Sequence, residues 1–436
     1  MIQRNIYLEQ LILRMHNGLI KIITGIRRCG KSYLLFNIFG NYLLENGVKE
    51  NNIIKIALDD IDFAEYRNPL KLKDYISNRI GNSSERFYIF IDEIQLCYRI
   101  RKDDIDETKI APEDLDSLYI SFYDILNSLL AKNNLDIYIT GSNSKMLSSD
   151  ILTVFRGRGD CIQVHPLSFS EFYSFCGGDK SDSWENYMTY GGMPQAVLTD
   201  DERRKRTYLI DLFENVYLKD IVERRKLDND GLLSNIVDVL CSAIGSLTNP
   251  HKLVNTLSSV CNIKTSDHTL NKYLNLLTEA FLFSKINRYD IKGKKYFNTP
   301  SKYYAEDAGL RNARLNWRQQ EKTHIMENIL FNELNLRGYP VDIGIVGIDT
   351  YSNNKRQLIQ HEIDFIINNG FKQIYIQSAF ALTDREKENQ ELLPLRHCRD
   401  SFIKYIVTGG NEKKWIDESG IIHIGIIPFL LEEKIL

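Results

Sequence analysis

The sequence has few residues that could form disulfides or a structural metal site. Its seven cysteines among 436 residues are scattered and odd in number, and none of them belongs to a Cys-x-x-Cys pair. This pattern argues against a disulfide framework and a zinc site, and it is typical of proteins in a reducing compartment. The cysteines therefore predict a cytoplasmic protein.

The chain also lacks a long hydrophobic run and an excess of charge of either sign. Its longest apolar stretch, residues 421–431, is too short to span a bilayer, and the first ten residues contain no apolar signal core. Lys and Arg number 55 against 58 Asp and Glu, which gives a formal net charge of −3. No global basic field draws the protein onto nucleic acid, so any such contact must come from a local patch.

The first half does contain a series of β-branched apolar runs separated by helical patterns. The runs are residues 19–24, 52–58, 87–92, 136–140 and 161–165. Continuous apolar runs suit strands buried on both faces, and helical spacers between them indicate a parallel α/β sheet. The polar, acidic stretch between Arg99 and Leu118 is predicted to be a loop after the third strand.

A phosphate-binding loop is predicted between the first strand and the helix that follows it. Residues 25–32, GIRRCGKS, match G-x-x-x-x-G-K-[ST] in the strand–loop–helix context that this motif requires. The two glycines let backbone N–H groups turn toward phosphate oxygens, Lys31 reaches the β- and γ-phosphates, and the Ser32 hydroxyl ligates magnesium. The predicted nucleotide-binding residues are Gly25, Ile26, Arg27, Arg28, Cys29, Gly30, Lys31, Ser32 and Tyr33.

Two carboxylates at the end of the third strand are predicted to complete the catalytic site. Asp92 would hold magnesium, and Glu93 would polarise the attacking water. Asn143, after the next strand, could orient that water because its amide both donates and accepts hydrogen bonds. Arg158 could act on the γ-phosphate in the same chain or a neighbouring one, with a contribution of roughly 10³–10⁵ in rate. The alternative for Arg158 is a surface arginine in a glycine loop.

Six segments, in this order, resemble those of a large group of prokaryotic AAA-type ATPases. They are GIRRCGKS, FIDEIQ, ITGSNSKMLSSDI, FRGRG, HPLSFSEF and YGGMP. The resemblance covers essentially the whole chain, and Arg158 matches the family's usual arginine. It implies an α/β fold with an AAA-like P-loop sheet, then a helical winged-helix segment and a C-terminal restriction-endonuclease-like domain. The resulting divisions are an ATPase domain at 1–183, a helical lid or linker at 184–229, a winged-helix-like segment at 230–317 and a nuclease-like domain at 318–436.

The predicted winged-helix segment offers a local basic patch. Ser266 can cap a helix whose apolar positions include Leu270, Leu274 and Leu277, at helical spacing. A basic hairpin follows it, and a wing of this charge could give salt-sensitive DNA binding. The residues predicted for DNA contact are Lys272, Arg288, Lys292, Lys294 and Lys295. Winged helices also serve as protein-contact modules, so a protein partner is the alternative.

The nuclease-like part is predicted to be catalytically degenerate. The resemblance places Glu327, Asp364 and Gln377 where a metal-dependent nuclease keeps its carboxylate cluster, which acts together with a lysine near the attacking water. The usual E-x-K element reads Gln377-Ser378-Ala379 here, so an amide replaces one ligand and alanine replaces the lysine.

The sequence therefore predicts an ATP- and Mg²⁺-binding ATPase whose nucleotide state repositions its C-terminal modules on a partner. One alternative is a DNA-binding regulator or defence factor that uses ATP only as a ligand. A metal-dependent nuclease and a small-molecule kinase are further alternatives. An arginine acting from a neighbouring chain would require a homo-oligomer.

Overall fold

The computed structural model describes residues 2–103, 105, 110–141, 157–225, 230–260, 262–352, 355–370, 372–398 and 400–432. The chain forms two compact units, residues 1–164 and 165–436. The finer divisions at residues 183, 229 and 317 stay predictions. Every cysteine that the structure describes is a free thiol. Within the same residues, no helix is both long and apolar enough to cross a membrane.

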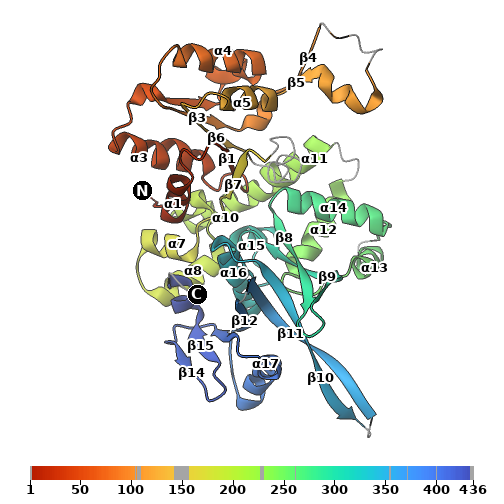
Figure 1. The fold of residues 1–436 in the computed structure, drawn as a ribbon. Coiled ribbons are helices and arrows are strands. Elements are labelled where there is room, and N and C mark those ends of the chain that lie inside the picture. The colour runs from red at the N-terminus through yellow and green to blue at the C-terminus, as the bar shows by residue number, and fades with distance from the viewer. Residues whose placement is uncertain are drawn as a thin grey trace. The chain divides into compact units, whose positions relative to one another are not determined.

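The first unit is built on a five-stranded parallel sheet, which confirms the predicted sheet (Figure 1). Its strands are β1 Ile20–Thr24, β2 Ile53–Ala57, β3 Phe87–Asp92, β6 Leu135–Thr140 and β7 Gly159–Gln163. They lie in the order β2-β3-β6-β1-β7, and each neighbouring pair is parallel. Because parallel strands end at one edge, the residues that follow β1, β3 and β6 meet there.

Helices cover both faces of this sheet (Figure 1). The helical segments are α1 Asn5–Leu13, α2 Lys31–Tyr33, η1 Leu34–Phe39, α3 Gly40–Glu45, η2 Glu50–Asn52, η3 Ile61–Arg67, α4 Pro69–Ile80, η4 Ile94–Leu96 and α5 Phe122–Leu130. Ile89 and Ile91 of β3 pack with α4 and α5, whereas Phe90 contacts the rings of Phe39 and Tyr138. This alternation is the period of two expected for a strand with both faces buried.

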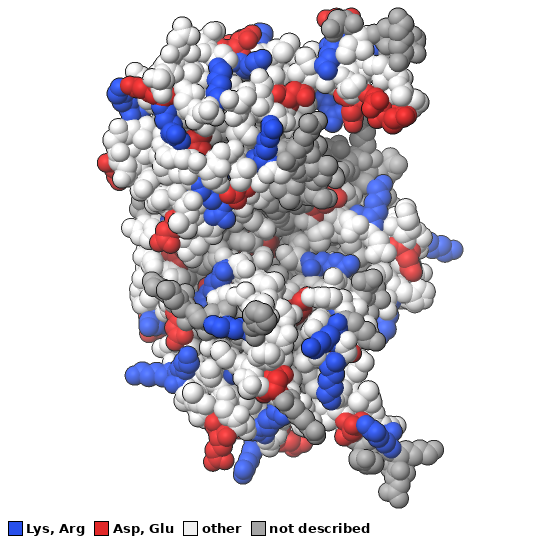
Figure 2. All heavy atoms as spheres, viewed as in Figure 1, with Lys and Arg blue, Asp and Glu red and all other residues white. Residues whose placement is uncertain are grey.

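The acidic stretch after β3 has more structure than predicted. Within it, the 3-10 helix η6 covers Pro112–Leu118, and β4 Ile100–Arg101 pairs with β5 Tyr119–Ile120, which directly follows the stretch. The prediction of a plain loop is therefore wrong here. Glu113, Asp114 and Asp116 of this stretch are exposed. Acidic side chains gather at the upper right of the face shown in Figure 2. Elsewhere on that face, cations and anions are interspersed.

The second unit opens with a series of helices. They are α7 Phe169–Cys176, α8 Lys180–Tyr190, α9 Pro194–Val197, α10 Glu202–Asp211, η8 Leu212–Leu218, α11 Lys219–Arg225, α12 Asp230–Ser242, α13 Pro250–Val260 and α14 Asp267–Glu279. The predicted cap of α14 is confirmed, because the Ser266 hydroxyl accepts a hydrogen bond from the N–H of Thr269 at 3.1 Å. The apolar positions Leu270, Leu274 and Leu277 are buried as predicted.

The rest of the second unit contains one eight-stranded mixed sheet (Figure 1). Its strands are β8 Phe283–Asp290, β9 Lys295–Ala305, β10 Val341–Ser352, β11 Lys355–Asn369, β12 Lys372–Ala379, β13 Ile403–Thr408, β14 Trp415–Ile416 and β15 Ile422–Gly425. The helices among them are α15 Ala308–Arg314, α16 Lys322–Leu336, α17 Arg385–His397 and α18 Ile426–Leu431. The order is β14-β15-β13-β12-β11-β10-β8-β9. The hairpin predicted as a wing, β8–β9, therefore shares a sheet with the strands predicted as nuclease-like.

Candidate functional site

The loop from Gly25 to Ser32 joins β1 to the helix that begins at Lys31. The φ angles of Gly25 and Gly30 are 140° and 99°, in a region that favours glycine. A Cβ at Gly25 would lie 2.0 Å from the carbonyl oxygen of Val164. Both glycines thus allow the backbone to turn, and Gly25 also allows residue 164 of the same chain to approach closely.

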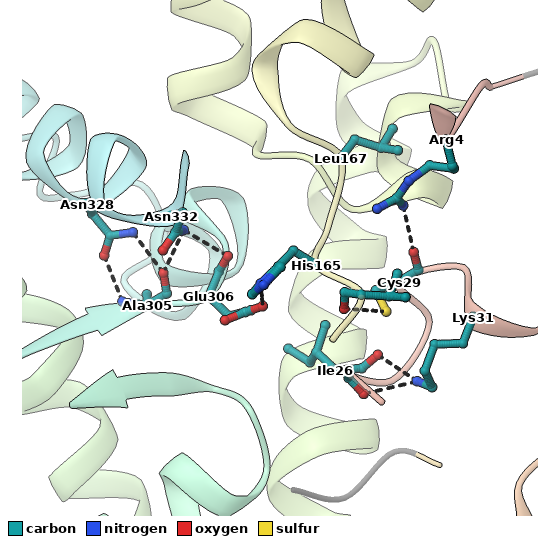
Figure 3. A network of polar contacts seen from close by, with 12 residues as sticks. Arg4, Ile26, Cys29, Lys31, His165, Leu167, Ala305, Glu306, Asn328 and Asn332 are labelled. Carbon is teal, nitrogen blue, oxygen red and sulfur yellow. Dashed lines mark hydrogen bonds and ion pairs between the residues drawn. The ribbon is translucent and has the colours of Figure 1, made fainter. Parts of the chain in front are cut away.

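The side chains of Lys31 and Arg4 donate hydrogen bonds to backbone carbonyl groups of this loop (Figure 3). Lys31 is 4% exposed, and its Nζ donates hydrogen bonds of 3.0 Å to the carbonyl oxygens of Gly25 and Ile26. The buried guanidinium of Arg4 donates to the carbonyl oxygen of Cys29 at 3.1 Å. Arg4 was not expected from the sequence, since nothing in the first residues signals a contact with residues 25–32.

Ser32 and Asp92 come together at the edge where β1 and β3 end. The Ser32 hydroxyl donates to Oδ2 of Asp92 at 2.7 Å, and the Thr140 hydroxyl donates to Oδ1. Burial raises the pKa of Asp92 above its ordinary value, although the hydrogen bonds from Thr140 and Ser32 act in the opposite direction. Hydroxyl and carboxylate oxygens are ligands that Mg²⁺ prefers, and Mg²⁺ commonly uses one or two protein oxygens beside phosphates and water. This pair fits a magnesium ion.

Glu93 follows Asp92 in an unusual backbone conformation. Its φ and ψ are 52° and 47°, the left-handed region that non-glycine residues seldom adopt. Its N–H donates to the Thr140 hydroxyl oxygen at 3.0 Å, and the side-chain amide of Gln95 donates to its carboxylate. Neighbouring side chains therefore hold both the backbone and the side chain of Glu93.

Sequence reasoning missed Thr140 and Gln95. Thr140 is the last residue of β6, which lies between β1 and β3. A signal existed for it, because ligands of open α/β sheets bind outside the carboxyl ends of the strands. Gln95 carries no comparable signal, since its contact with Glu93 depends on the turn that follows β3.

Replacing Thr140 with valine is expected to destabilise the first unit by about 1–3 kcal/mol. Valine keeps the shape of threonine but removes the hydroxyl that Asp92 and Glu93 share. Denaturant unfolding of the full chain would measure the loss. Thr140→Ser, which retains the hydroxyl, is the matched control and should lose much less. Equal stabilities of Thr140→Val and the wild type would contradict this assignment.

Asn143 and Arg158 were also predicted for the site, and the structure describes only the second of them. Asn143 lies outside the described residues. Arg158 directly precedes β7, where Gly159 pairs with Ile20 at the start of β1. Arg158 therefore lies at the opposite edge of the sheet, roughly 16 Å along β1 from its loop end. Its predicted action on a nucleotide in the same chain is wrong for this reason, whereas action from a neighbouring chain stays a prediction.

The second unit brings the predicted nuclease-like residues together. Glu327 lies on α16, Asp364 on β11 and Gln377 on β12, and the N–H of Asp364 donates to Oε1 of Gln377 at 3.4 Å. A lysine is also present, but β9 supplies it. Nζ of Lys302 lies 2.8 Å from Glu327, 2.5 Å from Glu362 and 3.5 Å from Asp364. The inference that this cluster has lost its lysine, drawn from Ala379, is therefore wrong.

Donors of the chain itself surround the carboxylates of this cluster. The Tyr304 hydroxyl donates to Glu327 at 2.6 Å, and the N–H of Ser378 donates to Asp364 at 2.9 Å. Burial and the charge of Asp364 raise the pKa of Glu327 to about 7. Among the described residues, no group of three or more His, Cys, Asp or Glu side chains is arranged to hold a metal ion. The ammonium of Lys302 is the cation of this cluster.

The residues predicted for DNA contact differ in their surroundings. Lys272 and Lys294 are exposed. Lys292 donates to the carbonyl oxygen of Gly347 at 2.7 Å, and the Arg288 guanidinium lies 5.3 Å from the centre of the Phe297 ring. Lys295 begins β9, and its side chain is outside the description. Lys292 and Arg288 thus have structural contacts within the second unit.

Comparison with known proteins establishes the family. Residues 17–173 match a family described as an AAA domain, and residues 181–321 match a domain of unknown function, DUF8612. An uncharacterized protein of Haemophilus influenzae is 34% identical over 438 residues, with 99% of each chain covered. The chain belongs to this AAA-type P-loop ATPase family. An uncharacterized protein of Methanocaldococcus jannaschii, MJ1544, is 27% identical over 387 residues, which cover 85% of this chain and 77% of that protein.

Solved structures of similar proteins are more distant from this AAA-family chain. The Aeropyrum pernix ORC1 protein in complex with DNA is 10% identical, with a TM-score of 0.30, over 72% of this chain and 93% of that one. Cdc6p from Pyrobaculum aerophilum is 13% identical, with a TM-score of 0.26, over 76% of this chain and 94% of that one.

Proposed function

We propose that the chain is a magnesium-dependent ATPase, which hydrolyses ATP to ADP and phosphate and uses its nucleotide state to control C-terminal modules on a partner. The observation that carries this proposal is the hydrogen bond between Ser32 and Asp92, at the edge where Glu93 and Lys31 also lie. Membership of an AAA-type family supports it. The scattered free thiols support a cytoplasmic location.

Each residue has a role that follows from its position and chemistry. Backbone N–H groups of residues 25–32 bind phosphate oxygens, and Lys31 exchanges its carbonyl partners for the β- and γ-phosphates. Ser32 and Asp92 hold magnesium, which when bound neutralises charge on the phosphates. Glu93 accepts a hydrogen bond from the attacking water and so orients it.

The decisive experiment measures phosphate release by the purified full chain with Mg-ATP. Glu93→Gln is expected to lower turnover by roughly 10²-fold or more, because a neutral amide is a much weaker base than a carboxylate. Its affinity for ATP, measured by calorimetry, should change little. Exposed Glu50→Gln is the matched control and should keep wild-type turnover. ATP binding without turnover in the wild type would leave the alternative, an ATP-gated DNA-binding regulator or defence factor.

The position of Lys302 argues against nuclease activity in the second unit. Its ammonium lies among Glu327, Glu362 and Asp364, where a divalent cation would have to bind. Gln377 has an amide in place of a carboxylate, and this amide donates a hydrogen bond to Glu391 at 2.9 Å. The C-terminal part is therefore proposed to bind a partner rather than to cut DNA. A role for Arg158 toward a neighbouring chain would make the active form a homo-oligomer.

A further inference from the structure

Two side chains contact Glu93, one at the end of β6 and one in the turn after β3. The backbone N–H donates to the Thr140 hydroxyl oxygen at 3.0 Å, which ties residue 93 to the end of β6. The amide of Gln95, in the 3-10 helix η4, donates to the Oε2 atom of the Glu93 carboxylate. Glu93 adopts a left-handed conformation, and the side chains of residues 93 and 95 meet across this turn.

Left-handed backbone conformations of non-glycine residues cost free energy and concentrate at functional sites, where the surrounding structure maintains them. A glutamate side chain has several rotatable bonds, and its carboxylate is therefore not fixed by the backbone alone. A hydrogen bond to one carboxylate oxygen orients the other. The Gln95 amide thus limits the directions in which Glu93 can present Oε1.

We infer that Gln95 is a positioning residue, which aims the carboxylate of Glu93 at the attacking water. The inference rests on the proposed ATPase function. In this role, the effect of Gln95 on turnover passes through Glu93. A misplacement of about 1 Å in a reacting group can cost roughly 10²-fold in rate.

The test compares Gln95→Met with the wild type, because methionine has a similar volume but no donor. Turnover at saturating Mg-ATP is expected to fall by roughly 10- to 100-fold, while the dissociation constant for ATP stays within about twofold, since Gln95 lies outside the phosphate loop. Unchanged or faster turnover, in a variant that unfolds at the wild-type temperature, would overturn the inference. No turnover in the wild-type chain would overturn the proposed function, and this inference with it.

A double variant separates positioning from a general structural effect. If Gln95 acts through Glu93, adding Gln95→Met to Glu93→Gln should cause no further loss of turnover. If Gln95 only supports the fold, the two losses should multiply, and the inference would be overturned. Gln95→Asn keeps the amide on a side chain shorter by one methylene. Gln95→Asn is therefore expected to have a higher turnover than Gln95→Met. An equal or lower turnover would contradict the proposed role of the amide in orienting Glu93.

Discussion

Lys31→Ala is expected to lower the affinity for Mg-ATP by about 100-fold or more, with loss of measurable turnover. Lys31 is buried at the start of α2, and its ammonium is already directed into the loop at the carbonyl oxygens of Gly25 and Ile26. Hydrogen bonds from an ammonium to phosphate are charge-assisted, and each contributes about 1.5–3 kcal/mol. Two such bonds account for a loss of this size.

The control for Lys31→Ala is a lysine in the same unit that lies outside the loop. Lys49 is exposed and pairs with Glu85, and surface ion pairs contribute only about 0–1 kcal/mol. Lys49→Ala should therefore bind Mg-ATP like the wild type, as calorimetry would show. If Lys31→Ala also bound with wild-type affinity, residues 25–32 would not be the phosphate site.

The sequence was informative for the first unit because its signals are local. The apolar run at residues 87–92 and its terminal carboxylates lie within one strand and the turn after it, so both the buried strand and the position of Asp92 were predictable. The sheet order was not, because the insertion of β6 between β1 and β3 depends on long-range pairing. Without that order, the contact of Thr140 with Asp92 and the position of Arg158 at the opposite edge could not be derived.

The second unit shows where local reasoning fails. The E-x-K pattern lies within one strand, and Ala379 in its last position predicts a missing lysine. Lys302 precedes Asp364 by 62 residues and comes from the segment assigned to the winged helix. Only the joining of β8 and β9 to β10 in one sheet reveals that these residues belong to one cluster. Residue spacing cannot reveal a lysine supplied by another strand.

The cluster around Lys302 predicts a large effect on stability. Lys302 is 3% exposed, and its ammonium compensates Glu327, Glu362 and Asp364. Burial lowers the pKa of Lys302, but the attraction of these carboxylates outweighs it and raises the pKa above its ordinary value. Gly245 lies beside the same cluster, because a Cβ there would lie 3.2 Å from Oε1 of Glu327.

Lys302→Met is expected to lower the free energy of unfolding at neutral pH by about 3–5 kcal/mol, because it leaves buried carboxylates without their cation. The loss should depend on pH. The pKa of Glu327 is about 7 in the folded chain, above its ordinary value of 4.5, so its contribution to stability is full below about 4.5 and is lost as the pH rises through 7. Lys302 opposes this rise in pKa. Without it the pKa of Glu327 increases further, and the deficit of the variant should grow between about pH 5 and pH 8.

Denaturant unfolding of the full chain at pH 5 and pH 8 would measure this dependence. Lys285→Met is the matched control, since Lys285 belongs to the same hairpin but is exposed, and its loss should be small at both pH values. The double variant that combines Lys302→Met with Glu327→Gln should be more stable at pH 8 than Lys302→Met alone, because it removes one of the uncompensated charges. A deficit that is the same at both pH values would mean that Lys302 acts through packing of its aliphatic chain rather than through its charge.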